Sequence, residues 1–216
     1  MVEDTRCEVS TAREDILQRV RAAIGQQAAD EPVQRDYRQT PSLSEGEKIE
    51  LFIDRLHDYN AQVYRCGPGE EAATIAEALA ARGKTRILIP PGFPAHLLPT
   101  GPTFVPDTQL DYREIDATEG ALTAATAAIA MTGSLILTHS ETEGRRALTL
   151  IPDYHLCVVY TNQLVETVPE GLRALGGRRT SPVTTIAGPS ATADIEMTRV
   201  KGVHGPRVLD VIIVAV

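Results

Sequence analysis

A chain of 216 residues with 43% hydrophobic and 23% charged residues has room for one α/β domain and a small appendage. The absence of Trp and an aromatic content of only 4% indicate a core built from aliphatic side chains. The net charge of −8 argues against a nucleic-acid partner, because nucleic-acid-binding domains usually carry a basic surface.

Three widely separated cysteines, Cys7, Cys66 and Cys157, form no CxxC pair. We therefore expect no metal site and no cofactor in this chain, and a reducing cytoplasm as its compartment. The N-terminus has no apolar segment of the kind found in signal peptides, and the longest apolar run, 208–216, is too short to span a bilayer.

The N-terminal region is predicted to be an appendage. Apolar residues recur at helical spacing within 10–25, and Gly25 is a plausible helix end. The polar stretch 26–43 contains two prolines, which is typical of a linker. We therefore expect an N-terminal helix and arm in 1–43 and an α/β domain in 44–216.

From residue 44 onward, helical and extended patterns alternate. This alternation predicts an α/β fold with a mostly parallel sheet flanked by helices. The predicted helices are 44–60, 70–82, 118–131, 143–150 and 169–175, and the predicted strands are 62–66, 86–89, 112–115, 133–138, 156–160 and 183–187, with a proline-punctuated loop at 93–110.

The C-terminal stretch 184–216 is the first place to look for function. Its pattern predicts a strand, a turn at Gly188, a helix opening at Ser190, a second glycine turn at 202–206 and a buried strand. In α/β proteins, ligands usually bind at the turns of such a unit.

A glycine turn that leads into a helix can present free N–H groups to an anion, although Asp194 and Glu196 would complement the helix dipole and repel one. A purely structural helix start is therefore the alternative. His204 could act as an acid or base, or it could simply fix its turn through a hydrogen bond. The candidate acid–base residues are His204 and Asp194, and the candidate ligand-binding residues are Gly188, Ser190, Thr192, Glu196, Gly202, Gly205, Gly133 and Arg145.

The loop 138–146 follows a predicted strand and is also rich in polar residues. The spacing of its histidine and glutamates does not match that of a compact metal site. For the glutamates, a solvated loop is the favoured interpretation. Arg145 and Arg146 could clamp an anionic substrate. The sequence has no Walker A motif, no GxGxxG after a strand and no GxSxG.

The segments 132–133, 150–152 and, above all, 188–196 with 202–206 resemble the LUD-domain family. The resemblance implies a fold similar to that of the sugar-isomerase and CoA-transferase superfamily. It also implies a part in the oxidation of L-lactate to pyruvate, beside partner proteins that carry the iron–sulfur clusters. The family commonly has an acidic residue where this chain has Met131.

Two further functions remain open at this point. The chain could be a stand-alone enzyme of the same superfamily that acts on a small anionic metabolite such as a sugar phosphate, a folate or a CoA ester. It could also be a protein that only binds such a ligand. The sequence shows neither the glycine-tyrosine-rich phosphate loop of a folate cyclo-ligase nor a clear counterpart of a CoA-transferase glutamate.

Overall fold

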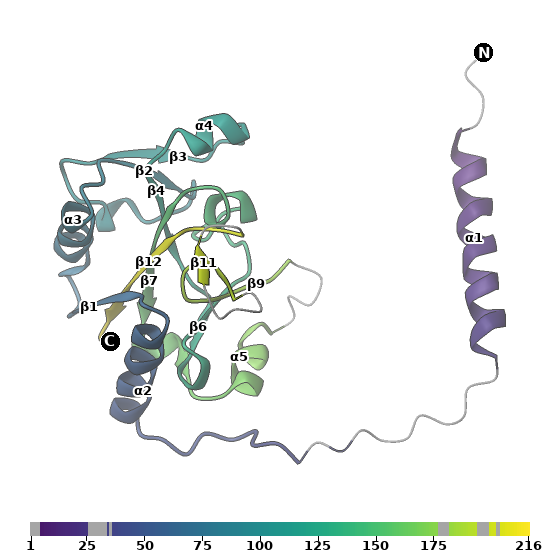
Figure 1. Cartoon of the computed structure of the whole chain (residues 1–216), viewed down its shortest axis with the longest axis horizontal. Coiled ribbons are helices and arrows are strands. Elements are labelled where there is room, and N and C mark those ends of the chain that lie inside the picture. The colour runs from purple at the N-terminus through teal and green to yellow at the C-terminus, as the bar shows by residue number, and fades with distance from the viewer. Residues whose placement is uncertain (1–4, 26–33, 35, 177–181, 194–198, 202–203) are drawn as a thin grey trace. The chain divides into compact units, whose positions relative to one another are not determined.

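The computed structural model describes residues 5–25, 34, 36–176, 182–193, 199–201 and 204–216 (Figure 1). The chain divides into two units, Met1–Tyr37 and Arg38–Val216. The first unit contains the predicted N-terminal helix, α1 (Thr5–Ile24), whose apolar residues Ile16, Val20 and Ile24 are exposed. No helix in the described part of the chain is both long and apolar enough to cross a membrane.

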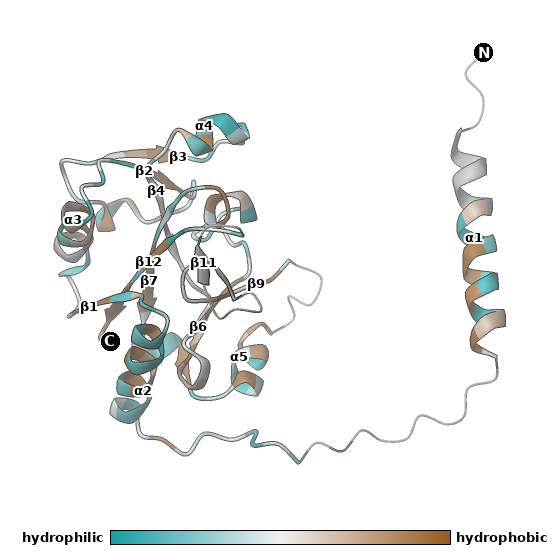
Figure 2. Cartoon of the chain, in the orientation of Figure 1, coloured by the Kyte–Doolittle hydropathy of each residue, from teal (hydrophilic) through white to brown (hydrophobic). Residues whose placement is uncertain are grey.

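The second unit is built on a six-stranded sheet in which all neighbouring strands are parallel, so the predicted α/β class is confirmed. Its interior strands β12 and β7 are mostly brown in Figure 2, as expected for strands buried on both faces. In spatial order the strands are β1 (Gln62–Cys66), β12 (Val208–Val214), β7 (Tyr154–Tyr160), β4 (Gly120–Ala124), β2 (Arg86–Ile89) and β3 (Thr103–Pro106).

A second, four-stranded sheet packs with α2 (Glu45–Asp58) on one face of the six-stranded sheet. Phe52 and Leu56 of α2 share an apolar cluster with Leu135 of the second sheet and Val211 of the first. The opposite face is covered by α3 (Glu71–Ala81), and it forms a separate apolar cluster. The second sheet has the order β8 (Leu164–Val165), β5 (Ala127–Ile129), β6 (Ser134–Leu137) and β9 (Thr184–Ala187).

Short helices complete the second unit. The helix α2 begins at Ser44, whose side chain forms with Glu47 the capping box that the sequence predicts. The other α-helices of this unit are α4 (Tyr112–Asp116) and α5 (Val168–Ala174). Its described residues also form the 3-10 turns η1 (Ala95–Leu97), η2 (Ala130–Thr132), η3 (Arg146–Thr149) and η4 (Thr161–Gln163).

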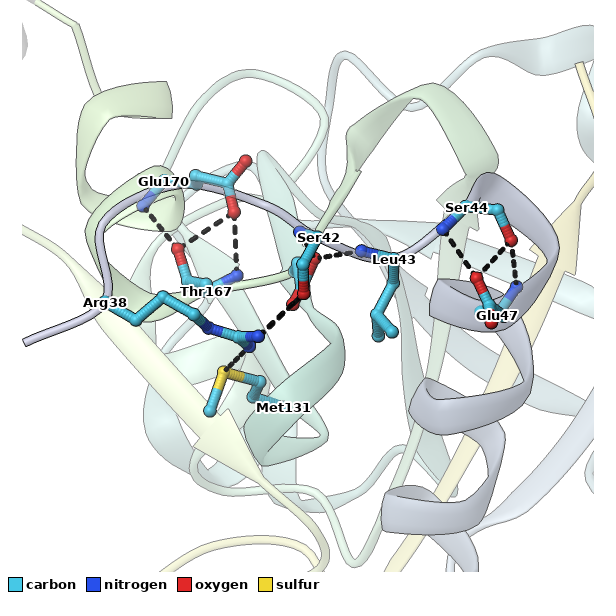
Figure 3. A network of polar contacts seen from close by, with 9 residues as sticks. Arg38, Ser42, Leu43, Ser44, Glu47, Met131, Thr167 and Glu170 are labelled. Carbon is cyan, nitrogen blue, oxygen red and sulfur yellow. Dashed lines mark hydrogen bonds and ion pairs between the residues drawn. The ribbon is translucent and has the colours of Figure 1, made fainter.

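Residues 38–43, at the start of the second unit, are held by a network around one carboxylate, and Arg173 also donates to the Gln39 carbonyl at 2.7 Å. Glu166 is fully buried and accepts hydrogen bonds from the backbone N–H groups of Ser42 (2.5 Å) and Leu43 (2.8 Å). Arg38 forms an ion pair with Glu166 at 2.6 Å, and its guanidinium also donates to Met131 Sδ at 3.0 Å (Figure 3). We call this network the arm clasp.

Three predicted stretches are wrong in type, among them the loop 93–110, which contains the strand β3. The stretch 118–131 forms β4 and β5 instead of a helix, and a Cβ at Gly120 would lie 2.6 Å from the Tyr154 ring, so small residues permit close strand packing here. The stretch 112–115 lies in α4 instead of a strand, because Asp111 and Glu114 form a capping box. The predicted helix 143–150 shortens to η3.

The predicted helix after Gly188 is also wrong in the described residues. β10 (Ala191–Ala193) and β11 (Arg199–Lys201) pair as antiparallel strands at this position. β9 and β12, which flank them, belong to different sheets. A helix N-terminus that binds an anion is therefore not available at Ser190.

Candidate functional site

The two glycine turns singled out in the sequence meet at one cavity of about 260 Å³, which we call the inter-sheet pocket. β9 and the turn 188–190 form one wall, and residues 204–206 form another. Arg146 and Thr149 of η3 contribute a third side, and the first residues of β7 and β12 complete the lining. The structure thus brings together Gly188, Ser190, His204 and Gly205.

Hydrogen bonds tie the two turns to each other. Ser190 N–H donates to the Pro206 carbonyl at 2.7 Å, and His204 N–H donates to Ser190 Oγ at 3.0 Å. Gly188 has φ +76°, and a Cβ there would lie 2.7 Å from Cγ of Tyr59, at the end of α2. Both its backbone conformation and the nearby tyrosine therefore require glycine at this position. The His204 side chain is exposed at the pocket.

His155 of β7 lines the pocket and is almost fully buried. Its Nε2 lies 2.8 Å from Thr123 Oγ1, whereas its Nδ1 is the one buried side-chain nitrogen or oxygen without a hydrogen-bond partner in the described part of the chain. Burial lowers the pKa of His155 to about 4, so the ring is neutral near pH 7. A buried, unpaired ring nitrogen is costly unless a ligand or water satisfies it.

His155 is not among the candidate site residues inferred from the sequence. A signal was present, because this histidine stands inside the apolar strand 154–160. Parallel strands of this kind are buried on both faces, so a polar residue within one needs a partner or a function.

The neighbouring arginines Arg145 and Arg146 have different surroundings. Arg145 donates to both carboxylate oxygens of Asp107, at 2.7 and 3.0 Å, and to the Leu110 carbonyl. The hydrogen bonds to Asp107 raise the pKa of Arg145, and its side chain is not among those that line the pocket. Arg146 lines the pocket, is exposed, and forms no ion pair within the described residues. Of the two arginines predicted to clamp an anion, only Arg146 lines the inter-sheet pocket.

The remaining predicted site residues lie elsewhere or are not described. Gly133 ends η2 with φ +60°, where a Cβ would lie 2.8 Å from Cβ of Arg55. Thr192 is in β10, outside the set of residues whose side chains are described. Asp194, Glu196 and Gly202 lie outside the described residues.

A wider cavity of about 920 Å³ lies beside the loop 138–143, past the carboxyl end of β4. Its buried carboxylate, Glu143, accepts hydrogen bonds from Thr126 Oγ1 and Thr138 N, both at 2.6 Å, so the favoured solvated state is wrong for this glutamate. Both ring nitrogens of His139 are engaged, by Gly144 O and Thr184 Oγ1. This loop is therefore held by internal bonds. In the described part of the chain, His, Cys, Asp and Glu form no group of three or more that could hold a metal ion.

Residues 107–214, half of the chain, match the LUD domain. A lactate utilization protein C from Deinococcus radiodurans is 43% identical over 175 residues, which cover 80% of this chain and 82% of that protein. The chain belongs to the LUD-domain family. Every residue that lines the inter-sheet pocket falls within the matched segment.

Two further relatives extend this similarity. The crystal structure of a DUF162 family protein from Deinococcus radiodurans has a TM-score of 0.71 and 38% sequence identity, and it covers 80% of this chain and 99% of its own. An uncharacterized protein of Neisseria meningitidis is 27% identical over 224 residues, 95% of this chain and 94% of its own. The family assignment therefore does not depend on the matched domain segment alone.

Proposed function

We propose that this LUD-domain protein is a component of an L-lactate oxidation system in the cytoplasm, and that its inter-sheet pocket binds a small carboxylate. Relatives named lactate utilization protein C, from Deinococcus radiodurans, Shouchella clausii and Halalkalibacterium halodurans, support a role in lactate utilisation. In this proposal, partner proteins carry the iron–sulfur clusters that accept the electrons.

One observation carries the ligand part of the proposal: the pocket is lined by His155, whose buried Nδ1 has no hydrogen-bond partner, and by Arg146, which forms no ion pair, both in the described part of the chain. The Arg146 guanidinium offers paired donors that match a carboxylate. The unpaired Nδ1 of His155 offers a second contact. A small hydroxy acid has one group for each of them.

The tautomer of His155 favours a ligand that carries a hydroxyl group. Thr123 Oγ1 lies 3.9 Å from Cys157 Sγ with the geometry of a donor to it. If Thr123 uses its only proton in this way, His155 Nε2 must donate to Thr123, which leaves Nδ1 as an acceptor. The hydroxyl of a 2-hydroxy acid would satisfy it.

Calorimetric titration of the purified chain with L-lactate at pH 7 tests the ligand part. We expect saturable one-to-one binding, and we expect Arg146→Ala to weaken it about 10- to 100-fold, the range for losing a hydrogen-bonded charge. Arg65→Ala is the matched control, because it removes an exposed arginine whose ion-pair partner, Glu50, is also exposed. Equal affinity in the wild type and Arg146→Ala would refute the site.

The partner half of the proposal needs its own experiment. A pull-down from lactate-grown cells should recover cysteine-rich iron–sulfur proteins with the tagged chain, and deletion of its gene should stop growth on L-lactate as sole carbon source. Turnover of a metabolite by the purified chain alone would instead favour a stand-alone enzyme.

A further inference from the structure

The inter-sheet pocket does not end at Arg146. Arg146 and Leu150 also line a second cavity of about 570 Å³, and the other residues around it are Tyr112, Arg113, Asp116, Ala147 and Ile151. We call this cavity the outer groove. Because two residues are shared, the two cavities meet at a cation that has no ion-pair partner within the described residues.

The outer groove is mainly apolar. Ala147 and Ile151 are partly buried against a cluster that contains Leu88 and Leu148. Tyr112 and Leu150 present large apolar surfaces, with 68% and 41% of their area exposed. A concave apolar surface with a few polar groups at one end is typical of a small-molecule site.

The geometry points to a ligand that is longer than lactate: a 2-hydroxy carboxylate with an uncharged alkyl tail. Its carboxylate pairs with Arg146, its hydroxyl lies in the inter-sheet pocket, and its tail lies in the outer groove. This inference rests on the proposed function in one respect, which is that a carboxylate binds at Arg146.

The position of Arg146 sets the orientation of this ligand. Arg146 lines both cavities, whereas Arg113 and Asp116 line only the outer groove, where both are exposed. A carboxylate at Arg146 can therefore place its hydroxyl in the inter-sheet pocket and its tail against the apolar residues Ala147 and Ile151 of the outer groove.

A chain-length series tests the inference directly. L-Lactate and the L-2-hydroxy acids of four, six and eight carbons would be titrated into the purified full-length chain by calorimetry, below any concentration at which the acids aggregate. Each buried methylene should tighten binding about two- to fourfold until the groove is filled. Equal affinities along the series, with lactate still bound, would overturn this inference and leave the proposed function intact. If none of the acids binds, the ligand part of the proposed function fails as well.

Substitutions in the outer groove test whether the alkyl tail of the ligand binds there. Tyr112→Ala and, separately, Ile151→Ala should reduce the ratio of the eight-carbon to the three-carbon affinity several-fold. Tyr112 is exposed, so its truncation does not threaten folding. Tyr37→Ala is the matched control, because it removes another exposed tyrosine that does not line the groove. An unchanged ratio in both groove variants would place the tail elsewhere and overturn the inference.

Discussion

The arm clasp and the inter-sheet pocket differ in whether their buried polar groups are hydrogen-bonded. In the arm clasp, the buried Glu166 carboxylate receives two backbone N–H groups, the Ser42 hydroxyl at 3.1 Å and the Arg38 guanidinium. In the inter-sheet pocket, His155 is equally buried, but its Nδ1 has no partner and Arg146 stands without an ion pair in the described part of the chain.

Under the proposed function, this difference distinguishes polar groups that hold the fold together from polar groups that a ligand would satisfy. A buried group that is fully hydrogen-bonded holds neighbouring segments together, whereas an unpaired buried group raises the free energy of the folded state until something binds to it. Asp210 in β12 belongs to the first kind, because Arg82 donates to both of its oxygens, at 2.9 and 2.7 Å, and Tyr154 donates at 3.1 Å.

Asp210→Ala should have the largest effect on stability. It removes a fully buried carboxylate from the centre of the sheet and leaves the Arg82 guanidinium and the Tyr154 hydroxyl without their acceptor. We expect a loss of about 3–5 kcal/mol in the free energy of unfolding, measured by urea denaturation. Since Arg82 remains about one-third exposed and can reach water, the lower end of that range is expected.

Asp153→Ala is the control for this experiment. Asp153 pairs with Arg207 at 3.3 Å, but both side chains are mostly exposed, so the expected loss is at most about 1 kcal/mol. Equal losses in the two variants would mean that the saturation of Asp210 is not what stabilises the sheet.

His155 should make the unfolding free energy depend on pH. Its pKa is about 4 in the folded chain, below the ordinary value of 6.5, so the unfolded state takes up a proton first as the pH falls. The stability contribution is fully present above pH 6.5 and is lost between pH 6.5 and about 4, to a limit of about 3 kcal/mol. Urea denaturation across this window should show a steeper decline for the wild type than for His155→Gln.

The comparison with His155→Gln is needed because carboxylates also titrate near the lower end of this window. Glutamine can still form a hydrogen bond with Thr123, so the variant removes the titrating ring while it keeps that contact. Parallel curves for the two proteins would show that His155 is not held neutral by burial.

The regular parts of the fold could be predicted from the sequence because their signals are local. The strands 62–66 and 86–89 have the predicted bounds, and the Ser44 cap of α2 follows from its capping box. The small-residue stretch 118–131 could not be assigned, because its alanines carry a helical propensity that packing against Tyr154 overrides. Its conformation is decided by distant residues.

The site was predictable in part for the same reason. Glycine turns at Gly188 and Gly205 have sequence signals, and the structure places both at one pocket. The different roles of Arg145 and Arg146 could not be predicted, because Asp107, which holds Arg145, lies 38 positions away in the chain. The unpaired nitrogen of His155 depends on which side chains surround it, and no local pattern encodes that.

Of these substitutions, Glu166→Gln should change the free energy of unfolding least. Its effect should be confined to the arm clasp. Hydrogen bonds, first of all from the Leu43 backbone, hold the pKa of Glu166 below its ordinary value of 4.5. The clasp is therefore fully formed above pH 4.5 and is lost as the pH falls through that lowered pKa. Hydrogen exchange at pH 7 should be faster at the Ser42 and Leu43 amides in Glu166→Gln, since a neutral amide offers one acceptor oxygen and no ion pair to Arg38.

The matched control for the arm clasp is Glu50→Gln, which neutralises an exposed glutamate paired with Arg65 and should leave those two amides protected. In the wild type, acidification through the lowered pKa of Glu166 should reduce the protection factors of those two amides, as Glu166→Gln does at pH 7. Amides that stay protected under both conditions would mean that the arm is held by contacts other than the buried carboxylate. The contrast between a saturated and an unsaturated buried group would then no longer separate structure from function in this chain.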